Sequence, residues 1–299
     1  MTFVPLHPFY LYCEGESALK ETRCNINETQ KFSFGDDSVA SAYDNVLVPV
    51  LFEPWAVRLI KEYGPWEGRR VLDLATGSGI FAQLVAGQVG PGGKVSGTDI
   101  NSGMLALAKK RCAGLTPEVE FIESPAHPLE ISSDSIDFVV CQQGFQFFPD
   151  KDAAAREMYR VLCKGGKVII TTWRPVAECQ LFESICNALN VIGEPEISDM
   201  MRLPFDFMPD SHLTDHFESA GFVNVQLSQQ EQGLAIGGGA THAIEVAYAT
   251  PIRPKLLALS DEQQAEFRKT LTELLHELSA NRITMGRMVS NVLSGEKQT

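Results

Sequence analysis

Residues 71–82 read Val71-Leu72-Asp73-Leu74-Ala75-Thr76-Gly77-Ser78-Gly79-Ile80-Phe81-Ala82, and this stretch decides the fold that we expect of the chain. Its apolar run Val71, Leu72, Leu74 and Ala75 is typical of a parallel strand that is covered on both faces. Gly77 and Gly79 allow a tight turn and a close approach of the backbone to a ligand. Apolar residues at helical spacing follow, namely Ile80, Phe81, Leu84 and Val85. The stretch therefore predicts a buried strand, a glycine turn and the first turn of a helix.

Two kinds of ligand fit such a turn. The pattern Gly77-x-Gly79-x-x-Ala82 loosely matches the dinucleotide fingerprint, and Asp99 lies at about the right distance to hold a ribose. A pyrophosphate, however, binds best at a helix N-terminus that has no carboxylate beside it. Asp73 stands in the strand just before the turn, and a carboxylate there suits a positively charged ligand such as S-adenosylmethionine, which carries an ammonium and a sulfonium group. The residues favour this adenosyl ligand over NAD.

The segment from Val71 to Ala82 resembles the first motif of the class I S-adenosylmethionine-dependent methyltransferases. Residues 134–150 resemble the post-strand motif of the branch that includes quinone and natural-product biosynthesis, and residues 156–173 (REMYRVLCKGGKVIITTW) also resemble the family. The resemblance implies an α/β fold with a doubly wound, mostly parallel seven-stranded sheet, an N-terminal helical segment and a C-terminal helical cap. It also implies S-adenosylmethionine as cofactor and S-adenosylhomocysteine as product.

The expected organisation is an N-terminal lid with helices (1–66), a cofactor-binding core (67–175), and a substrate cap with the last sheet strands (176–299), all in one compact domain. The aromatic residues within 1–37 favour a lid over a substrate pocket, with a mobile terminus as the alternative. Pro49 and Pro54 divide the helical pattern from Ser38 to Tyr63 into two short helices. Within the resemblance, Tyr43 lies near the carboxylate of the cofactor; the alternative is a half-buried tyrosine on a packed helix.

A second strand, from Lys94 to Asp99, ends in an acid. Because ligands of doubly wound sheets bind at the carboxyl ends of the strands, we expect Asp99 to accept hydrogen bonds from both ribose hydroxyls. The alternative role, a helix cap, is better suited to Ser102. Ile100 and Met104 would then flank the adenine, although apolar residues at helical spacing are also typical of a core.

The third strand, Val119 to Ile122, leads into a departure from the family pattern. The family commonly has Gly-Asp-Ala after this strand, with the acid bound to the adenine amino group, whereas this chain has Pro125 where that Asp would be. The acceptor must therefore be Ser124, His127 or a backbone carbonyl, or packing alone holds the adenine. Pro125 and Ala126 are still expected beside the cofactor, as are Ala75, Gly77 and Gly79 in the glycine turn.

A buried strand from Ile136 to Cys141 is followed by a polar pair. Gln142 and Gln143 would place amide groups beside the sulfonium and the acceptor; the alternative is that they are turn residues. Several relatives carry histidine where Gln146 stands, and an amide is no general base at neutral pH, so Gln146 marks a catalytic position without a base. His242, which follows the glycines at 237–239, is the candidate base or substrate contact.

Beyond residue 175, where the resemblance thins and substrate choice usually resides, patterns and caps predict several further elements. These are helices at 179–192, 210–220, 241–249 and 260–279, the last with the capping box Ser260-x-x-Gln263, an irregular segment at 195–209, and strands at 223–227 and 283–293. In the resembled fold, the last strand is an antiparallel edge.

Charge and composition limit the partners. The net charge of −13 disfavours nucleic acid and anionic lipid surfaces, and therefore favours a small-molecule substrate. No apolar run approaches the roughly 20 residues of a membrane span, and residues 1–12 lack the features of a secretory signal, so we expect a cytoplasmic protein. The seven cysteines and the acidic and histidine residues show no spacing typical of a metal site. Monomer and homodimer both remain open.

Three functions are compatible with these patterns. The leading hypothesis is methyl transfer to a small-molecule acceptor by in-line displacement, in which the enzyme mainly positions the acceptor. The alternatives are a cyclase or rearrangement enzyme that binds the same cofactor, and an NAD-linked oxidoreductase.

Overall fold

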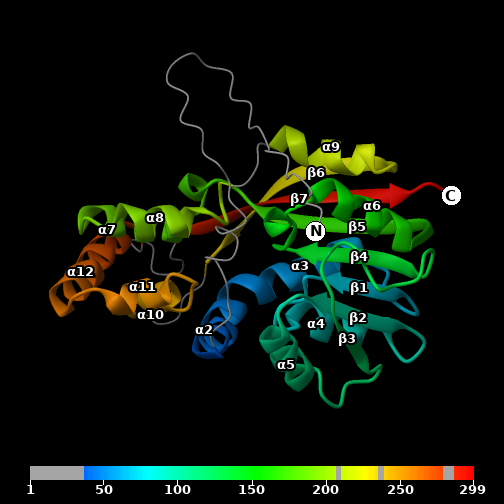
Figure 1. Cartoon of the computed structure of the whole chain (residues 1–299), viewed down its shortest axis with the longest axis horizontal. Coiled ribbons are helices and arrows are strands. Elements are labelled where there is room, and N and C mark those ends of the chain that lie inside the picture. Colours follow the sequence, from blue (N-terminus) through cyan, green and yellow to red (C-terminus); the bar gives the residue numbers. More distant parts are fainter. Residues whose placement is uncertain (1–36, 207–209, 235–238, 279–285) are drawn as a thin grey trace, which may run out of the picture.

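A seven-stranded sheet forms the centre of the computed structural model, which describes residues 37–206, 210–234, 239–278 and 286–299 (Figure 1). In order along the sheet, the strands are β3 (Val119–Glu123), β2 (Lys94–Asp99), β1 (Arg70–Leu74), β4 (Ile136–Gln142), β5 (Leu162–Trp173), β7 (Arg287–Lys297) and β6 (Phe222–Gly233). Strands β3 to β5 pair in parallel, and β7 runs antiparallel to both β5 and β6. The predicted doubly wound, mostly parallel sheet is therefore confirmed.

The central strands have continuous apolar runs because their side chains point alternately to two faces of the sheet that are both covered by helices. Val71, Val140 and Ile169 face a cluster that includes α3 (Glu53–Tyr63) and α4 (Ile80–Val89). Their neighbours Leu72, Val139 and Ile170 face a second cluster, formed with α6 (Lys151–Val161) and α9 (Asp210–Ser219). Successive side chains of a strand point to opposite faces, so a sheet that is covered on both sides needs apolar residues at every position.

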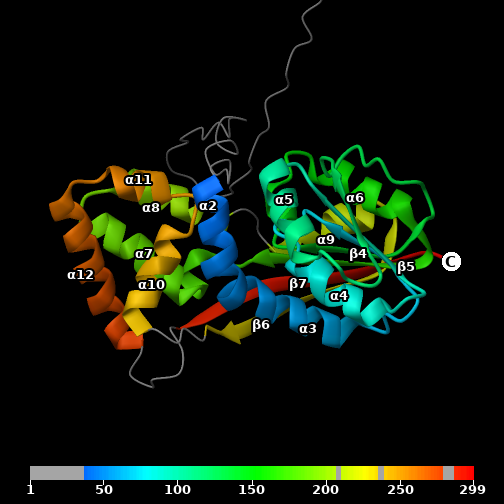
Figure 2. The ribbon, with the colours of Figure 1, turned by 90° about the horizontal axis from the view of Figure 1, so that it is seen from below.

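The helices α7 (Gln180–Val191), α8 (Pro195–Arg202), α10 (Gly239–Tyr248), α11 (Arg253–Ala258) and α12 (Asp261–Leu278) gather beyond one end of the sheet, at the left of Figures 1 and 2. Their apolar residues, among them Leu181, Val246 and Phe267, join the first cluster. The capping box of α12 is confirmed, since the Ser260 and Gln263 side chains each accept the other's backbone N–H at 3.2 Å. These helices form the predicted C-terminal cap.

Three expectations about the sheet and its cap are wrong. Strand β7 is not an edge, because β6 pairs along its outer side and is itself the edge. Strand β6 is also longer than the predicted 223–227. The segment predicted to be irregular begins with α8, which Pro195 opens at a first-turn position where its missing N–H costs nothing.

Two expectations about helix boundaries are also wrong. Residues 37–63 do not form two short helices but one continuous run of α2 (Asp37–Ala42), the π-helix η1 (Tyr43–Phe52) and α3. Helix α5 (Ser102–Arg111) is capped by Asn101, whose side chain accepts the Met104 N–H at 3.1 Å, and not by Ser102. The predicted cap of α6 is confirmed, since Asp150 accepts the Ala153 N–H at 2.8 Å.

Some expectations lie outside the described residues: the lid formed by residues 1–36, the glycine joint at 237–238, the end of the segment at 195–209, and residues 283–285 of the last strand. Within the described ranges, no helix has both the length and the apolar character that crossing a membrane requires.

Candidate active site

The glycine loop between β1 and α4 forms the floor of the site. Ala75, Gly77 and Gly79 all have positive φ, at 59°, 55° and 83°. A Cβ on Gly79 would lie 2.9 Å from the Cβ of Ala108 on α5, so this glycine is required both by its conformation and by the close approach of two helices. The loop is thereby held against α5, and the N–H of Thr76 donates to the Thr98 carbonyl near the end of β2 at 2.8 Å.

Asp99, at the end of β2, joins this loop to the neighbouring strand. One carboxylate oxygen accepts the Gly77 N–H at 2.9 Å, and the other accepts the Asn101 N–H at 2.9 Å. Burial raises the pKa of Asp99, and the hydrogen bonds from Asn101 and Gly77 oppose that rise. Each oxygen has a further lone pair, so the carboxylate can accept two more hydrogen bonds from a ligand.

Asp73 is the second acid of the site, and it is 1% exposed. Its Oδ2 accepts the Thr76 hydroxyl at 2.5 Å and the Ala82 N–H at 3.1 Å. Burial, and to a smaller extent the nearby Asp99, raise its pKa to about 7 against the lowering effect of the two hydrogen bonds. A ligand that brings a positive charge would stabilise the ionised form further, because the described groups that shift the pKa of Asp73 include no positively charged side chain.

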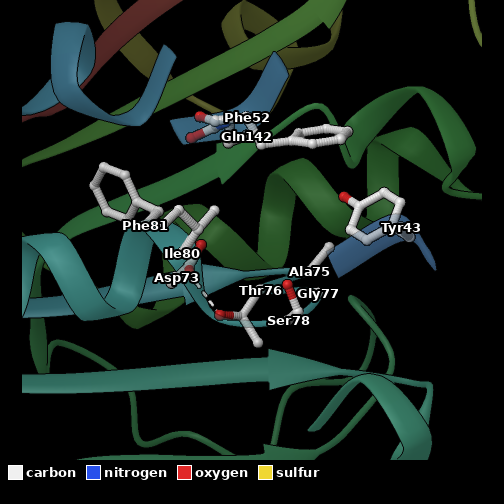
Figure 3. Close-up of a pocket in the computed structure, with 10 residues that line it drawn as sticks. All are labelled: Tyr43, Phe52, Asp73, Ala75, Thr76, Gly77, Ser78, Ile80, Phe81 and Gln142. Carbon is white, nitrogen blue, oxygen red and sulfur yellow. Dashed lines mark hydrogen bonds between the residues drawn. The ribbon is translucent and has the colours of Figure 1, made fainter. Parts of the chain in front are cut away.

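A small cavity, partly open to solvent, lies above the loop (Figure 3). Its floor consists of Asp73 and residues 75–78, with Ile80 and Phe81 at one side; Tyr43, Phe52 and Gln142 close it from above. Gln142 donates from Nε2 to the Phe52 carbonyl at 2.8 Å, which turns its Oε1 away from that bond. Oε1 of Gln142 and Oγ of Ser78 are both buried and have no hydrogen-bond partner among the residues that the structure describes. Buried polar atoms of this kind indicate that a bound ligand completes their hydrogen bonding.

The rings of Tyr43 and Phe52 line the cavity opposite the loop, and the rings of Trp173 and Phe205 pack in a row behind Phe52. The ring of Phe52 lies 5.0 Å from that of Tyr43 and 6.3 Å from that of Trp173, between centroids, and Trp173 lies 6.3 Å from Phe205. Burial, and then Asp99 and Asp44, raise the pKa of Tyr43 far above its ordinary value, so its phenol keeps its proton at any working pH. The cavity thus has a polar, acidic floor and an apolar, aromatic wall.

A model of the ubiE/COQ5 methyltransferase family matches residues 26–243, which include the loop, both acids and the aromatic wall. The chain belongs to this family. It is therefore an S-adenosylmethionine-dependent methyltransferase, and the NAD-linked alternative is wrong.

Individual relatives agree with this assignment. The demethylmenaquinone methyltransferase of Staphylococcus aureus (strain JH9) is 28% identical over 211 residues, which cover 66% of this chain and 87% of the relative. The phosphoethanolamine N-methyltransferase 2 of Haemonchus contortus, solved with S-adenosyl-L-methionine, matches with a TM-score of 0.60 at 18% identity, over 93% of this chain and 61% of that chain. The [4+2]-cyclase SpnF matches with a TM-score of 0.50 at 16% identity, over 83% of this chain and 81% of that chain. The two structural likenesses show the fold alone.

The site of this methyltransferase fits its cofactor. The unpartnered oxygens of Gln142 and Ser78 are acceptors for an ammonium group, and the free lone pairs of Asp99 are acceptors for hydroxyl groups. No positively charged side chain is among the cavity-lining residues of the described chain, so the charge of a sulfonium meets no repulsion there.

Two glutamines that we expected in the site are turned away from it. Gln143, 5% exposed, donates from Nε2 to the Ser290 hydroxyl on β7 at 2.8 Å. Gln146, 2% exposed, donates to the Pro204 carbonyl at 2.9 Å and accepts the Trp173 N–H at 3.1 Å. Neither lines the cavity, because each side chain satisfies a buried partner from a distant part of the chain. Both side chains therefore bond to other parts of the chain, and a contact of Gln143 with the cofactor or a role of Gln146 in catalysis stays a prediction.

The other predicted residues lie at varying distances from the loop. Ile100 is 72% exposed at the end of β2, whereas Met104 is buried on α5. The backbone N–H of Ser124, just before Pro125 and Ala126, donates to the Asp99 carbonyl at 3.0 Å, which places that segment beside Asp99. His242 is half-buried on α10 and does not line the cavity. Contacts of these residues with the cofactor or acceptor stay predictions.

Sequence reasoning missed several residues of the cavity. Thr76 and Ser78 lie between residues that we did identify, and their hydroxyl groups were a signal within the motif itself. Phe52 and Phe81 are ordinary apolar residues of helices, and no sequence signal distinguishes them from core residues.

Proposed function

We propose that this enzyme transfers the methyl group of S-adenosylmethionine to a small-molecule acceptor by in-line displacement. The observation that carries the proposal is the two-sided cavity: polar, acidic groups on the loop side and aromatic rings on the opposite side. The first side suits a charged amino-acid and sugar ligand, and the second suits an apolar acceptor.

On the cofactor side, Asp99 would hold the ribose hydroxyls, since both of its oxygens have lone pairs left after binding two backbone N–H groups. Asp73, Ser78 and Gln142 would hold the ammonium end, and Tyr43 would lie near the carboxylate. When bound, S-adenosylmethionine supplies an electrophilic methyl carbon on a sulfonium, which is a good leaving group.

On the acceptor side, Phe52 would contact an apolar molecule and exclude water from it, with Trp173 and Phe205 packed behind Phe52 to hold its ring in place. The lining residues described here include no histidine, the phenol of Tyr43 stays protonated, and Asp73 is already bonded to Thr76. We therefore infer an acceptor acidic enough to ionise without a dedicated base. The name of the Staphylococcus aureus relative makes demethylmenaquinone the first acceptor to test.

The test combines binding and product analysis. S-adenosylhomocysteine should raise the melting temperature with rising concentration, as mass action requires. With S-adenosylmethionine and demethylmenaquinone or another small quinol, mass spectrometry should show an acceptor that has gained one methyl group and an equal amount of S-adenosylhomocysteine. The Asp99→Ala variant is the control for uncatalysed transfer.

Two results would contradict the proposal. A product that gains no methyl mass while the cofactor stays intact would favour the cyclase alternative. Methylation confined to a protein or nucleic acid, after small quinols and phenols had failed, would overturn the small-molecule acceptor.

A further inference from the structure

The segment η1 carries two cavity residues, Tyr43 at its first position and Phe52 at its last (Figure 3). The Glu53 N–H just beyond it donates to the carbonyl of Val48, five residues earlier, as in a π-helix. The winding decides where the two rings point. In an α-helix of 3.6 residues per turn, residues nine positions apart lie on opposite faces.

A π-helix needs about 4.4 residues per turn, so two turns return almost to the same face. Tyr43 and Phe52 accordingly have ring centroids only 5.0 Å apart, and both lie over the glycine loop. The π winding is therefore what allows a single helix to place both rings on the cavity. Such winding is rare, because its geometry is less favourable than that of an α-helix, and it requires support from surrounding contacts.

One side chain, that of Arg111 at the end of α5, provides such support. Its Nε donates to the Ser78 carbonyl of the glycine loop at 2.9 Å, and its Nη1 donates to Gln83 of α4 at 3.5 Å. Its Nη2 forms an ion pair with Asp44, the residue after Tyr43. The Arg111 and Asp44 side chains are 20% and 22% exposed, so the pair is partly shielded from water. A planar guanidinium with five donors can make these bonds together, whereas a lysine cannot.

We propose that Arg111 is a positioning residue for methyl transfer: it ties η1 to the glycine loop and thereby holds Tyr43 and Phe52 over the cofactor. Arg111 does not itself line the cavity. The inference rests on the proposed placement of the cofactor in this cavity, and it assigns to α5 a role in the site besides packing.

The first test needs no cofactor. In the ligand-free Arg111→Met variant, the backbone amides of residues 43–52 should exchange hydrogen about tenfold faster than in the wild type, while those of β4 and β5 keep their rates. The matched control is Arg160→Met, because Arg160 also joins a carboxylate, that of Glu157, to backbone carbonyls, those of Ile131 and Leu129, but does so away from the cavity. Arg160→Met should leave the exchange of residues 43–52 unchanged.

The second test measures the affinity for S-adenosylhomocysteine by calorimetry and the kinetic constants. Arg111→Met should weaken binding and raise the KM for S-adenosylmethionine about tenfold, with kcat changed less than threefold at saturation. Arg111→Lys should fall between wild type and Arg111→Met. Tyr43→Phe should weaken binding less in the Arg111→Met background than in the wild type, since the ring is no longer held in place.

If Arg111→Met does not fold, Asp44→Asn, which removes only the ion pair, should show the same changes at about threefold. Unchanged exchange of residues 43–52, or additive effects of Arg111→Met and Tyr43→Phe, would overturn the proposal. Equal weakening by Arg160→Met would also overturn it, because the effect would then be general destabilisation. A wild type that binds no S-adenosylhomocysteine would refute the proposed function instead, and the exchange experiment would still decide the role of Arg111.

Discussion

The glycine loop after β1 and the turn after β4 lie side by side at the carboxyl ends of the strands, because β1 and β4 are neighbours and run parallel. The loop presents Asp73, Ala75 and Gly77 to the cavity as its sequence predicts. The turn was expected to present Gln142, Gln143 and Gln146, yet only Gln142 reaches the cavity.

The sequence separation between each side chain and its hydrogen-bond partner explains why the loop was predicted better than the turn. Asp73 is held by Thr76 and Ala82, which lie within nine residues of it. The glutamines of the turn are held by Phe52, Ser290 and Pro204, which lie 58 to 147 residues away. Where a side chain finds its partner locally, its direction follows from the motif. Where the partner is distant, residue type alone does not give the direction.

The most severe test of the loop is Asp99→Ala. It removes the acceptor of the Gly77 and Asn101 N–H groups together with the proposed ribose contacts. Hydrogen bonds to charged groups contribute about 1.5–3 kcal/mol each, so calorimetry should show affinity for S-adenosylhomocysteine falling at least about 100-fold. Asp137→Ala, which breaks a bond to Arg70 at the opposite end of β4, should leave the affinity unchanged. Affinity retained in Asp99→Ala would place the cofactor elsewhere.

The requirement for glycine at position 79 is tested with the Gly79→Ala variant, whose free energy of unfolding is measured by urea denaturation. Left-handed backbone and a Cβ only 2.9 Å from Ala108 should together lower the free energy of unfolding by about 2–3 kcal/mol. Gly114→Ala is the control, since Gly114 has a φ of 79° but open space around it, and should cost about 1 kcal/mol. Equal costs would mean that the close approach of α4 to α5 is unimportant.

The contrast within the turn is sharpened by comparing Gln142→Ala with Gln143→Ala. The first should weaken S-adenosylhomocysteine binding about tenfold, because it removes an acceptor in the cavity and a tie to Phe52. The second should lower the free energy of unfolding by about 1–2 kcal/mol through the lost bond to Ser290, with affinity nearly unchanged. Both variants are measured by calorimetry and by denaturation. If Gln143→Ala weakened binding and Gln142→Ala mainly lowered stability, our assignment of the two residues would be reversed.

The smallest expected effect is a pH dependence of cofactor binding. Because the pKa of Asp73 is raised to about 7, the ligand-free site is largely protonated below that pH, and a cationic ligand must displace the proton. S-adenosylhomocysteine brings such a positive charge in its ammonium group, so its affinity should rise by up to about tenfold from pH 6 to pH 8 and level off above the pKa. The same shift makes the contribution of Asp73 to ligand-free stability less favourable as pH rises from about 4 to 7. Asp73→Asn should bind with a flatter pH profile; an unchanged profile would exclude Asp73 as the titrating group.

Local patterns predicted much of this molecule. The strand and loop at 70–79, the cap formed by Asp150 and the capping box of Ser260 and Gln263 each depend on neighbours a few residues away, and the structure confirms them. The cap of α5 was misplaced by one residue because Asn101 and Ser102 are both good caps, and only the backbone conformation distinguishes them.

The sequence by itself determined the parallel sheet, the glycine loop and the position of Asp99 at the end of β2, since apolar periodicity, glycine conformation and short-range hydrogen bonds are properties of contiguous residues. Only the tertiary structure decided that β7 lies inside the sheet, that Gln143 and Gln146 bond to Ser290 and Pro204, and that Arg111 reaches both the loop and η1. Those outcomes depend on buried polar groups finding partners from distant segments, and that pairing exists only once the chain has folded.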